Sequence, residues 1–489
     1  MKKINLIYGF LTGLIILFYC SNAGAAQVNE EKVLIRISYQ SKAEERRVKA
    51  LNLDIVEEKP GEYIETKLTW EEIIKLHARN FDLSYVIEIE FPPIDSTYHS
   101  PSEIQSTLFN LASEYASIVS LDTIGRSTRY NRPIWAVKIS DNPHLDEDES
   151  RILLTGAHHA REPLSTEVCL YLIKKFCNNY HQDQKIFHWI NETEIWIVPV
   201  VNPDGYALIF DPTHNLRWWR KNLRDNNGNG LFEPDCDGVD LNRNYDFNWH
   251  SGGSLELDSQ YYRGPAPFSE QEIQALKQLA ENKRFAVIID FHSFGEAVLY
   301  PWGNFEDPPD LQLITELAAG MATQIRKTDG SGCYDIIPLD AQMGQSSVWY
   351  YGRLGILGFI VEVGETYFPP GDQILPIVEN NARAVEYILE RLHGACLTGH
   401  IYDLHSRQPV TARIEIEGLE SNVLNNYLVT ESLWGRFDRI LPAGVYSIRF
   451  HAEGYHPKVI KNVIISEDRP TRLTVYLLPE YVNKPPGND

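Results

Sequence analysis

The sequence predicts an α/β protein made of a small α/β unit, a large α/β domain with a mainly buried sheet, and a C-terminal β-sandwich. Three observations lead to this prediction. Helical and strand-like patterns alternate between residues 98 and 395, a βαββαβ pattern precedes them, and short strands of alternating polarity follow. The length of 489 residues also exceeds what one hydrophobic core usually covers.

Composition and charge exclude several classes of protein. Hydrophobic residues make up 43% and charged residues 23% of the chain, which is typical of globular rather than disordered proteins. The formal net charge of −22 argues against a nucleic-acid-binding protein, because such proteins normally carry a basic surface.

The first 25 residues have the pattern of an export signal. Lys2 and Lys3 precede an apolar run over residues 4–20, and Ala23-Gly24-Ala25 is a small-residue cleavage pattern. We therefore expect a signal peptide over residues 1–25 and a protein that is secreted, periplasmic or held at the cell surface. An uncleaved membrane anchor is the alternative, because the apolar run approaches the length that spans a bilayer.

The first folded part is expected over residues 27–92. Its strand-like and helical runs occur in the order βαββαβ, which is typical of a ferredoxin-like domain. Thr69-Trp70-Glu71-Glu72 is a capping-box pattern that opens the second helix, and a strand over residues 85–91 closes the unit.

The large domain is expected over residues 98–395, where buried strands alternate with helices. Its predicted strands cover residues 134–139, 151–155, 194–201, 285–291 and 356–363. Its predicted helices lie near residues 101–117, 163–179, 269–282 and 310–326.

The last part is expected over residues 396–480. Ile414 and Ile416 alternate there with charged residues, and frequent turns separate the short strands. This pattern predicts a small β-sandwich.

The most informative stretch is GAHHAREPLS, residues 156–165, at the end of a predicted strand. His159 and Glu162 are three residues apart, so one turn of backbone can direct both side chains to one point. Imidazole and carboxylate together suit zinc. By spacing alone, His158 and Glu162 are a competing ligand pair. A pair of surface residues without function is a further alternative.

Two further residues at strand ends extend this constellation. His292, at the end of an apolar run, is a candidate third ligand, with a hydrogen-bonded core histidine as the alternative. Two histidines and a glutamate leave a fourth zinc position for water, as in catalytic sites. Glu362, inside the buried run FIVEVG, is a candidate base, because a carboxylate there is costly to bury without a nearby cation.

Two arginine-rich segments, RWWRKN (217–222) and GVDLNRNYD (238–246), contribute Arg220, Asn242 and Arg243. A guanidinium binds a carboxylate through two parallel hydrogen bonds, and a side-chain amide adds another donor. Either segment alone would be interpreted as a surface salt bridge.

Together with TIGRS (123–127), RPIWAVKI (132–139) and VNPDGY (201–206), these motifs resemble those of zinc metallocarboxypeptidases of the pancreatic carboxypeptidase A/B type, in the same order. The resemblance covers roughly residues 98–390. It implies a mixed central sheet flanked by helices. It also implies hydrolysis of the C-terminal peptide bond of peptides or proteins by a zinc-activated water, with their C-termini as partners.

The resemblance also implies the roles of individual residues. The family pattern His-x-Arg-Glu selects His159 over His158 as a ligand. The implied set consists of the zinc ligands His159, Glu162 and His292, the general base and acid Glu362, the oxyanion donor Arg220, the carboxylate clamp Asn242 and Arg243, and a secondary carboxylate contact, Arg161.

Two positions depart from the family pattern. Asp340 stands where the family usually has an active-site tyrosine, nine residues before Trp349, and Tyr334 could replace it only if the loop is rearranged. The position that sets side-chain preference falls at or near Ser347, which is neither apolar nor charged. The sequence therefore names no preferred C-terminal residue.

The Asp225–Asp237 loop resembles the start of a calcium loop. Asp225, Asn227 and Asn229 alternate along it, but Cys236 stands at the twelfth position, where a glutamate ligand is expected. Calcium binding and a plain polar surface loop are equal alternatives.

The flanking parts resemble known attachments of this family. The N-terminal part resembles the propeptides of this family, and either inhibition of the enzyme or a simple folding role remains possible for it. The C-terminal part resembles a transthyretin-like sandwich, which implies a supporting role. Two rival functions remain. One is a peptidoglycan-stem peptidase on the same scaffold, which export would suit. The other is a secreted binding protein with a decayed site, which only the missing tyrosine supports.

Overall fold

The computed structural model divides the chain into two compact units, Met1–Glu90 and Phe91–Asp489. The expected signal peptide and Asp340 lie outside the described residues, as does most of the strand expected over residues 85–91. None of the helices in the described part of the chain is both long and apolar enough to cross a membrane. The described residues are 32–51, 53–69, 72–73, 75–76, 79, 81–85, 96–214, 216–301, 308, 310–339, 344–419 and 428–480.

The first unit contains a four-stranded antiparallel sheet in the order β2-β3-β1-β4, which is the ferredoxin-like order. Buried isoleucines of β1 and β3 form its core. The expected capping box is present, because the Thr69 N–H donates to the Glu72 carboxylate and the Glu72 N–H donates to Thr69 Oγ1. The elements are β1 (Val33–Ser38), α2 (Lys42–Lys49), β2 (Ile55–Lys59), β3 (Tyr63–Leu68) and β4 (Asp82–Tyr85).

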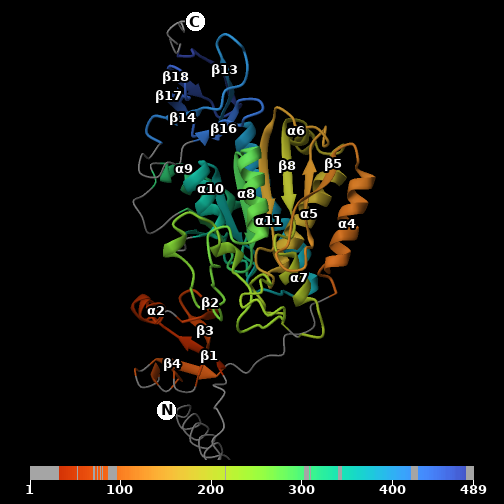
Figure 1. Ribbon diagram of the computed structural model, residues 1–489, viewed down its shortest axis with the longest axis vertical. Helices are drawn as coiled ribbons and strands as arrows, with labels where there is room; N and C mark the ends of the chain where they lie inside the picture. The colour runs from red at the N-terminus through yellow and green to blue at the C-terminus, as the bar shows by residue number, and fades with distance from the viewer. Residues whose placement is uncertain are drawn as a thin grey trace, which may run out of the picture. The chain divides into compact units, whose positions relative to one another are not determined.

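The second unit is built around an eight-stranded mixed sheet in the order β11-β10-β12-β9-β7-β8-β6-β5 (Figure 1). The four strands β12, β9, β7 and β8 run parallel to one another, whereas β5, β6 and β10 each pair antiparallel with a neighbour. The strands are β5 (Val119–Arg126), β6 (Pro133–Ile139), β7 (Ser150–Thr155), β8 (Thr193–Val198), β9 (Val287–His292), β10 (Ala297–Tyr300), β11 (Asp335–Pro338) and β12 (Leu357–Glu362).

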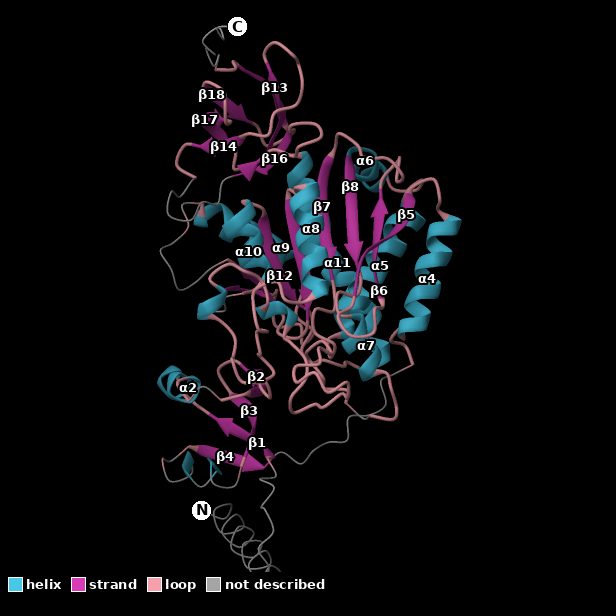
Figure 2. Cartoon of the chain, in the orientation of Figure 1, coloured by secondary structure: helices cyan, strands magenta, loops and turns pink. Residues whose placement is uncertain are grey.

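Helices lie on both faces of this sheet (Figure 2). Four of them, α4, α5, α8 and α9, agree with the expected helices to within a few residues. The others were not expected, and α10 illustrates why: it is buried on nearly every side, so its sequence has no polar stripe. The helices are α4 (Pro101–Glu114), α5 (Pro163–Asn179), α6 (Gln184–Glu192), α7 (Pro203–Ile209), α8 (Gln271–Lys283), α9 (Leu311–Gln324), α10 (Ser346–Leu354) and α11 (Gly371–His393).

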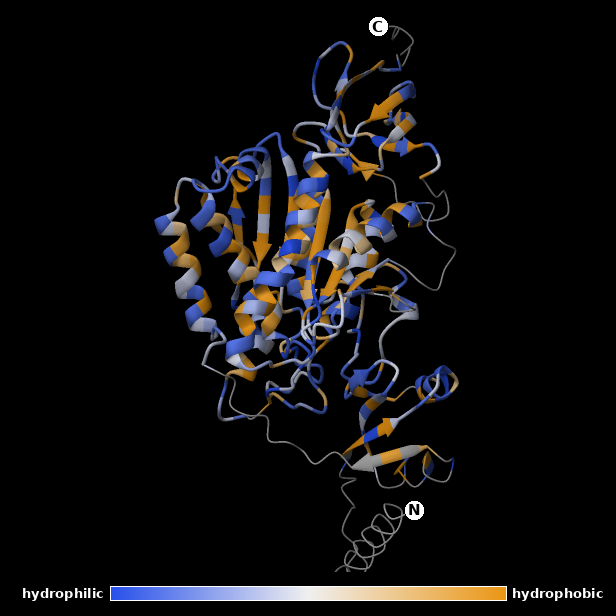
Figure 3. Cartoon of the chain, turned by 180° about the vertical axis from the view of Figure 1, so that it is seen from behind, coloured by the Kyte–Doolittle hydropathy of each residue, from blue (hydrophilic) through white to orange (hydrophobic). Residues whose placement is uncertain are grey.

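The central strands form the core of this domain, and the carboxyl ends of its parallel strands meet at one edge of the sheet. β7, β8 and β9 are buried along their whole lengths, and Figure 3 shows much of the sheet as hydrophobic. A charged residue in β8, Glu194, is paired with Lys138 and Arg151, both at 2.8 Å. Because β7, β9 and β12 are parallel neighbours, their carboxyl ends meet at one edge of the sheet, where residues converge.

Two further sheets form the C-terminal β-sandwich, in the orders β16-β13-β19 and β15-β14-β17-β18. Alternate residues of β14 are buried, as the sequence pattern predicts. The strands are β13 (Cys396–Asp403), β14 (Arg413–Ile416), β15 (Leu428–Val429), β16 (Arg436–Ile440), β17 (Gly444–His451), β18 (Lys458–Ile465) and β19 (Thr471–Leu477).

A buried network of charged groups joins β16 to the start of β7. The Arg436 guanidinium donates to both carboxylate oxygens of Asp438, at 2.8 and 2.9 Å, and to Ser150 Oγ at 3.0 Å. It also donates to the carbonyl oxygen of Asp148 at 2.9 Å. Arg436 and Asp438 are both buried, so neither can lose its partner without leaving a charge away from water.

We predict that Arg436→Met lowers the free energy of unfolding by about 3 kcal/mol, because it leaves the buried Asp438 carboxylate without a cation. Urea unfolding of the mature protein measures this change. Arg449→Met is the matched control, since the Arg449 side chain is 57% exposed and its pair with Glu415 is a surface contact. Equal losses in the two variants would contradict the prediction.

Candidate active site

Three groups expected in the site come from the ends of neighbouring strands. His159 follows β7, His292 is the last residue of β9, and Glu362 is the last residue of β12. Glu362 and His292 also stand opposite one another in the register of the two parallel strands. The convergence is therefore a direct consequence of the sheet order.

A sharp turn after β7 directs His159 and Glu162 back toward β9. Ala157 adopts a left-handed conformation with φ of 48°, and its N–H donates to Ser165 Oγ at 2.8 Å. Gly156 allows this close approach, since a Cβ there would lie 2.9 Å from the carbonyl oxygens of Pro199 and Ser165. Glu162 then directly precedes α5.

The side chains of His159, Glu162 and His292 meet at one point. His159 Nδ1 lies 2.7 Å from Glu162 Oε1 and 3.0 Å from His292 Nδ1, which is itself 2.9 Å from Glu162 Oε2. All three side chains are buried, and together they could hold a metal ion. Lone pairs that face one another at such distances repel unless a proton or a cation lies between them, so this donor set fits zinc.

The protonation of His159 and Glu162 also suits a metal. Burial lowers the pKa of His159, and the neighbouring Arg220 lowers it further, which favours the neutral imidazole. Burial alone would raise the pKa of Glu162, but His159 and His292 outweigh it and leave this pKa below its usual range. A neutral imidazole and an ionised carboxylate are the forms that bind metals.

Asp240 was not among the expected site residues, yet it connects three of them. Its Oδ1 lies 3.1 Å from His159 Nε2 and accepts the Asn242 N–H at 2.9 Å, and its Oδ2 accepts from Arg220 Nε at 2.9 Å. Burial alone would raise its pKa, but Arg220 and Arg243 hold that pKa well below the usual range. In the sequence, its position two residues before Asn242 in GVDLNRNYD is the feature that could have indicated this role.

Glu362 lies in a largely enclosed setting beside the three metal-binding candidates. Gly295 packs directly against it, because a Cβ at that glycine would lie 3.1 Å from the Glu362 Cβ. Burial raises the pKa of Glu362 to about 7, against the opposing charge of His292. The carboxyl group can therefore both accept and release a proton near neutral pH.

Arg220, Asn242 and Arg243 are brought to the same site, so the surface salt-bridge alternative is wrong. Their side chains are 8%, 2% and 7% exposed, respectively. The guanidinium carbons of Arg220 and Arg243 lie 5.1 and 5.4 Å from the centre of the Tyr261 ring. Tyr261 was not expected from the sequence, and its ring helps to hold two like-charged groups side by side.

Arg161 lies next to these groups but is partly engaged within the protein. It donates to Gln260 Oε1 at 2.6 Å and to the Trp218 carbonyl oxygen at 3.4 Å. Its guanidinium carbon is 4.7 Å from the centre of the Tyr367 ring. Gln260 and Tyr367 had no signal in the sequence, because the contacts that bring them here are long-range.

Tyr334 does not take the place of the missing tyrosine. Its hydroxyl accepts from the Gly364 N–H at 3.0 Å and from the Asn381 amide at 3.1 Å, and its side chain is buried. The hydroxyl thus has a structural role between β12 and α11.

The Asp225–Asp237 loop closes on itself through hydrogen bonds. The Asp225 carboxylate accepts two backbone N–H groups at 2.7 Å, and the amides of Asn227 and Asn229 donate to Glu233 at 2.6 and 2.7 Å. Within the described residues, the side-chain groups that could hold a metal do not include this loop, and its cysteine is a free thiol.

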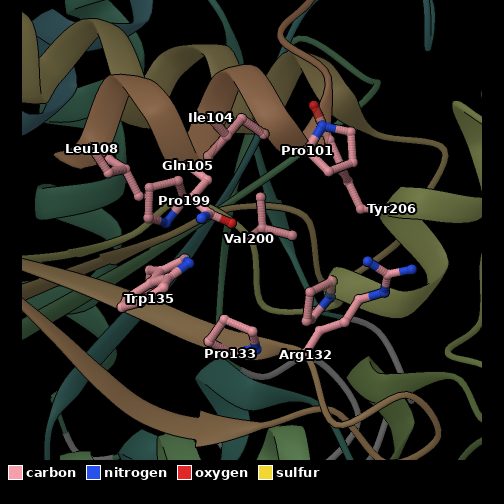
Figure 4. Close-up of a pocket in the computed structure, with 11 residues that line it drawn as sticks. Pro101, Ile104, Gln105, Leu108, Arg132, Pro133, Trp135, Pro199, Val200 and Tyr206 are labelled. Atoms are coloured by element: carbon pink, nitrogen blue, oxygen red, sulfur yellow. The ribbon is translucent and has the colours of Figure 1, made fainter. Parts of the chain in front are cut away.

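An apolar groove between α4 and the starts of β6 and α7 contains none of the expected site residues (Figure 4). It offers no acid, histidine or thiol, so it does not contribute to the chemistry described above. Its lining includes Ile104, Leu108, Pro133, Trp135, Pro199 and Tyr206.

The sequence of the large domain matches the family model for zinc carboxypeptidases over residues 104–384. The chain belongs to the zinc carboxypeptidase family. As a member of that family it is a metallocarboxypeptidase, a hydrolase of the class that the resemblance implied.

Individual zinc carboxypeptidases and related proteins support this membership. The chain is 32% identical to carboxypeptidase A2 of Rattus norvegicus over 307 residues, which are 60% of this chain and 70% of the rat protein. It is 28% identical to an inactive metallocarboxypeptidase of Sclerotinia sclerotiorum over 318 residues, 58% of this chain and 52% of that protein. The fold matches the crystal structure of carboxypeptidase A from Helicoverpa armigera with a TM-score of 0.62 and 22% identity, over 74% of this chain and 97% of that one.

We predict that Asp240→Asn weakens zinc binding about 10- to 100-fold, because His159 loses the carboxylate that orients its ring. Competition with a chelator measures the affinity. Asp204→Asn is the control, since the buried Asp204 accepts backbone N–H groups of Arg129 and Tyr130 and forms an ion pair with Arg132, away from the metal-binding candidates. Unchanged affinity in Asp240→Asn would show that the contact has no such effect.

Proposed function

We propose that this chain is an exported zinc carboxypeptidase that removes C-terminal residues from peptides or proteins. One observation carries the proposal: three buried metal-binding candidates lie beside the half-buried carboxyl group of Glu362 and a buried cluster of Arg220, Asn242 and Arg243. This set contains everything that hydrolysis of a terminal peptide bond requires.

His159, Glu162 and His292 would hold the zinc ion. When bound, zinc supplies a Lewis acid that polarises the scissile carbonyl group and lowers the pKa of water. Glu362 takes a proton from the attacking water and later passes it to the leaving amine, a double role that suits a pKa raised by burial to about 7.

Arg220 stabilises the negative charge that develops on the carbonyl oxygen. A single well-placed donor of this kind typically contributes about 3 kcal/mol to the transition state. Asp240 and the Tyr261 ring hold the guanidinium in place, so little reorganisation is needed during the reaction.

Asn242 and Arg243 hold the terminal carboxylate of the substrate. A guanidinium fork with an adjacent amide recognises a carboxylate, and an internal peptide bond has no such group to offer. This clamp makes the enzyme an exopeptidase. Arg161, whose donors are partly engaged by Gln260, is a secondary contact for the substrate.

We predict that Glu362→Gln lowers kcat by roughly 100- to 10,000-fold while the protein keeps its zinc, because only the proton acceptor is removed. Turnover of a reporter peptide and metal analysis of the same sample measure the two properties. Glu365→Gln, three residues further on and exposed, is the control with expected normal activity. Loss of the metal from Glu362→Gln would contradict the assigned role.

Two rival functions make different predictions for the intact protein. We expect release of C-terminal residues from peptides, abolished by a chelator that removes zinc and restored by added zinc. Cleavage of peptidoglycan stem peptides alone would favour the wall peptidase, for which export is equally suitable. Zinc binding without any cleavage would favour a decayed binding protein, and one relative is an inactive metallocarboxypeptidase.

The N-terminal unit is proposed to be a propeptide and the C-terminal β-sandwich a support. Calcium in the Asp225–Asp237 loop stays a prediction for a second ion. Calcium titration followed by thermal unfolding tests it, and a rise in Tm is expected if the oxygen-rich loop binds the ion. An unchanged Tm removes this part of the proposal.

A further inference from the structure

Two buried carboxyl groups outside the metal site have no part in the mechanism proposed above. Glu270 directly precedes α8, Glu272 lies in the first turn of that helix, and both residues are 0% exposed. The side-chain amide of Asn222 links them, because its Nδ2 donates to Glu270 Oε2 at 2.7 Å and lies 3.5 Å from Glu272 Oε1. The two carboxyl groups are therefore close neighbours away from water.

Glu270 supports the segment that carries Arg220. Asn222, which donates to Glu270, stands two residues after Arg220. The Asn222 Oδ1 accepts the Val239 N–H at 2.8 Å, and the Asn222 N–H donates to the Val239 carbonyl oxygen at 2.9 Å. Arg224 Nη1 also donates to Glu270 Oε1, at 3.1 Å. One carboxylate thus fixes two residues of this segment.

Glu270 also supports the segment that carries Arg243. The Glu270 N–H donates at 3.1 Å to Oδ1 of Asn244, the residue that follows Arg243. Ser269 Oγ accepts from Asn244 Nδ2 at 2.9 Å and donates to Glu270 Oε1 at 2.7 Å. Both arginine-bearing segments are therefore held from one point, the start of α8.

The groups that face Glu272 supply hydrogen bonds but no positive charge. Thr128, in the turn after β5, donates its N–H at 3.0 Å and its hydroxyl at 2.5 Å to the Glu272 carboxylate. The Asn222 amide is neutral as well. Burial and then the negative charge of Glu270 raise the pKa of Glu272 to about 7, although the hydrogen bonds from Thr128 oppose this shift.

The nearby arginines do not change this balance. Arg224 pairs with Glu270 at 3.1 Å, and its side chain is 31% exposed. Arg129, the residue after Thr128, pairs with Asp237 at 3.5 Å. One cation therefore serves two buried carboxyl groups, which is the charge of a pair that holds one proton.

We propose that Glu270 and Glu272 form one positioning pair, which holds Arg220 and Arg243 at the spacing a substrate requires only while the two carboxyl groups share a proton. This inference rests on the function proposed above, because that function assigns both arginines to the substrate. With the proton, the pair carries one negative charge, balanced by one cation. Without it, two like charges meet across a single amide, and their repulsion displaces the segments that the amide joins.

The direction of the pH dependence follows from this arrangement. Glu272 loses its proton as the pH rises through about 7, so substrate turnover should fall on the alkaline side. The folded state also holds this proton more tightly than the unfolded chain does, because the pKa of Glu272 is raised on folding. Stability should therefore be lost over the same rise in pH.

The pH profile of kcat/KM tests the proposal on the mature enzyme with zinc. For the wild type, kcat/KM for a peptide should fall above pH 7 by up to about tenfold per pH unit, as for a single ionisation. Glu272→Gln keeps the shape of the side chain but cannot ionise. Its kcat/KM at about pH 8.5 should stay within a few-fold of its value at pH 7, and its thermal stability should no longer fall over this range.

A second variant tests the same carboxyl group without removing it. Thr128→Val removes the hydroxyl that favours the ionised form of Glu272, so the alkaline fall should move to higher pH. Glu167→Gln is the matched control, because it also removes a buried carboxylate, but one that accepts from His99 at 2.8 Å on α5. It should keep the wild-type pH profile.

Glu270→Gln tests the positioning itself. It keeps the size of the side chain but removes the charge that holds Arg224. We expect KM to rise and kcat to fall together, each several-fold, because the proposed clamp and the proposed oxyanion donor both shift. Bound zinc should stay at one per chain, since Glu270 does not belong to the metal-binding candidates. A loss of stability with unchanged kcat and KM would show a purely structural role and overturn the proposal.

The remaining outcomes separate this inference from the proposed function. A wild-type profile without an alkaline fall, or the same fall in Glu272→Gln, would overturn the role of the pair and leave the carboxypeptidase function intact. Failure to release a terminal residue from any peptide at any pH would instead overturn the proposed function, and this inference with it.

Discussion

The carboxylate of Asp240 is the contact on which the geometry of the site depends. One buried group accepts from His159, from Arg220 and from the backbone of Asn242, so a candidate metal ligand, the proposed oxyanion donor and the proposed carboxylate clamp share a single anchor. In a medium of low dielectric each of these contacts is stronger than in water, and losing Arg220 would leave the buried charge of Asp240 unbalanced. The three elements are therefore fixed relative to one another before a substrate arrives.

The parallel sheet supplies the second half of this arrangement. Neighbouring parallel strands end at the same edge of a sheet. For this reason β7, β9 and β12 bring His159, His292 and Glu362 together. The segment between α7 and α8 then supplies the cations from outside the sheet. The strands thus hold the metal-binding candidates and the proposed base, and the hydrogen bonds of Asp240 fix the loop residues to them.

Much of this could be predicted from the sequence, for reasons that differ between elements. β9 and β12 are mostly apolar, so they are recognisable, and Glu362 is conspicuous as a charge at the end of β12. Asp240, Gln260, Tyr261 and Tyr367 escaped prediction because their roles arise from contacts between segments distant in sequence. α10 escaped because eight of its nine residues are buried, so its sequence lacks the polar face that identifies a surface helix.

Asp240 and Asp290 are the same residue type, but their different partners shift the pKa of the two carboxyl groups in opposite directions. Both are fully buried aspartates next to the candidate metal ligands. Asp240 has a guanidinium, an imidazole and a backbone N–H as partners, so its charge is balanced within the chain. Asp290 has the hydroxyls of Thr155 and Ser346 as neighbours and no lysine or arginine partner among the described residues, so burial raises its pKa. The guanidinium of Arg220 thus favours the ionised form of Asp240, whereas the hydroxyl neighbours of Asp290 do not outweigh burial, which favours its neutral form.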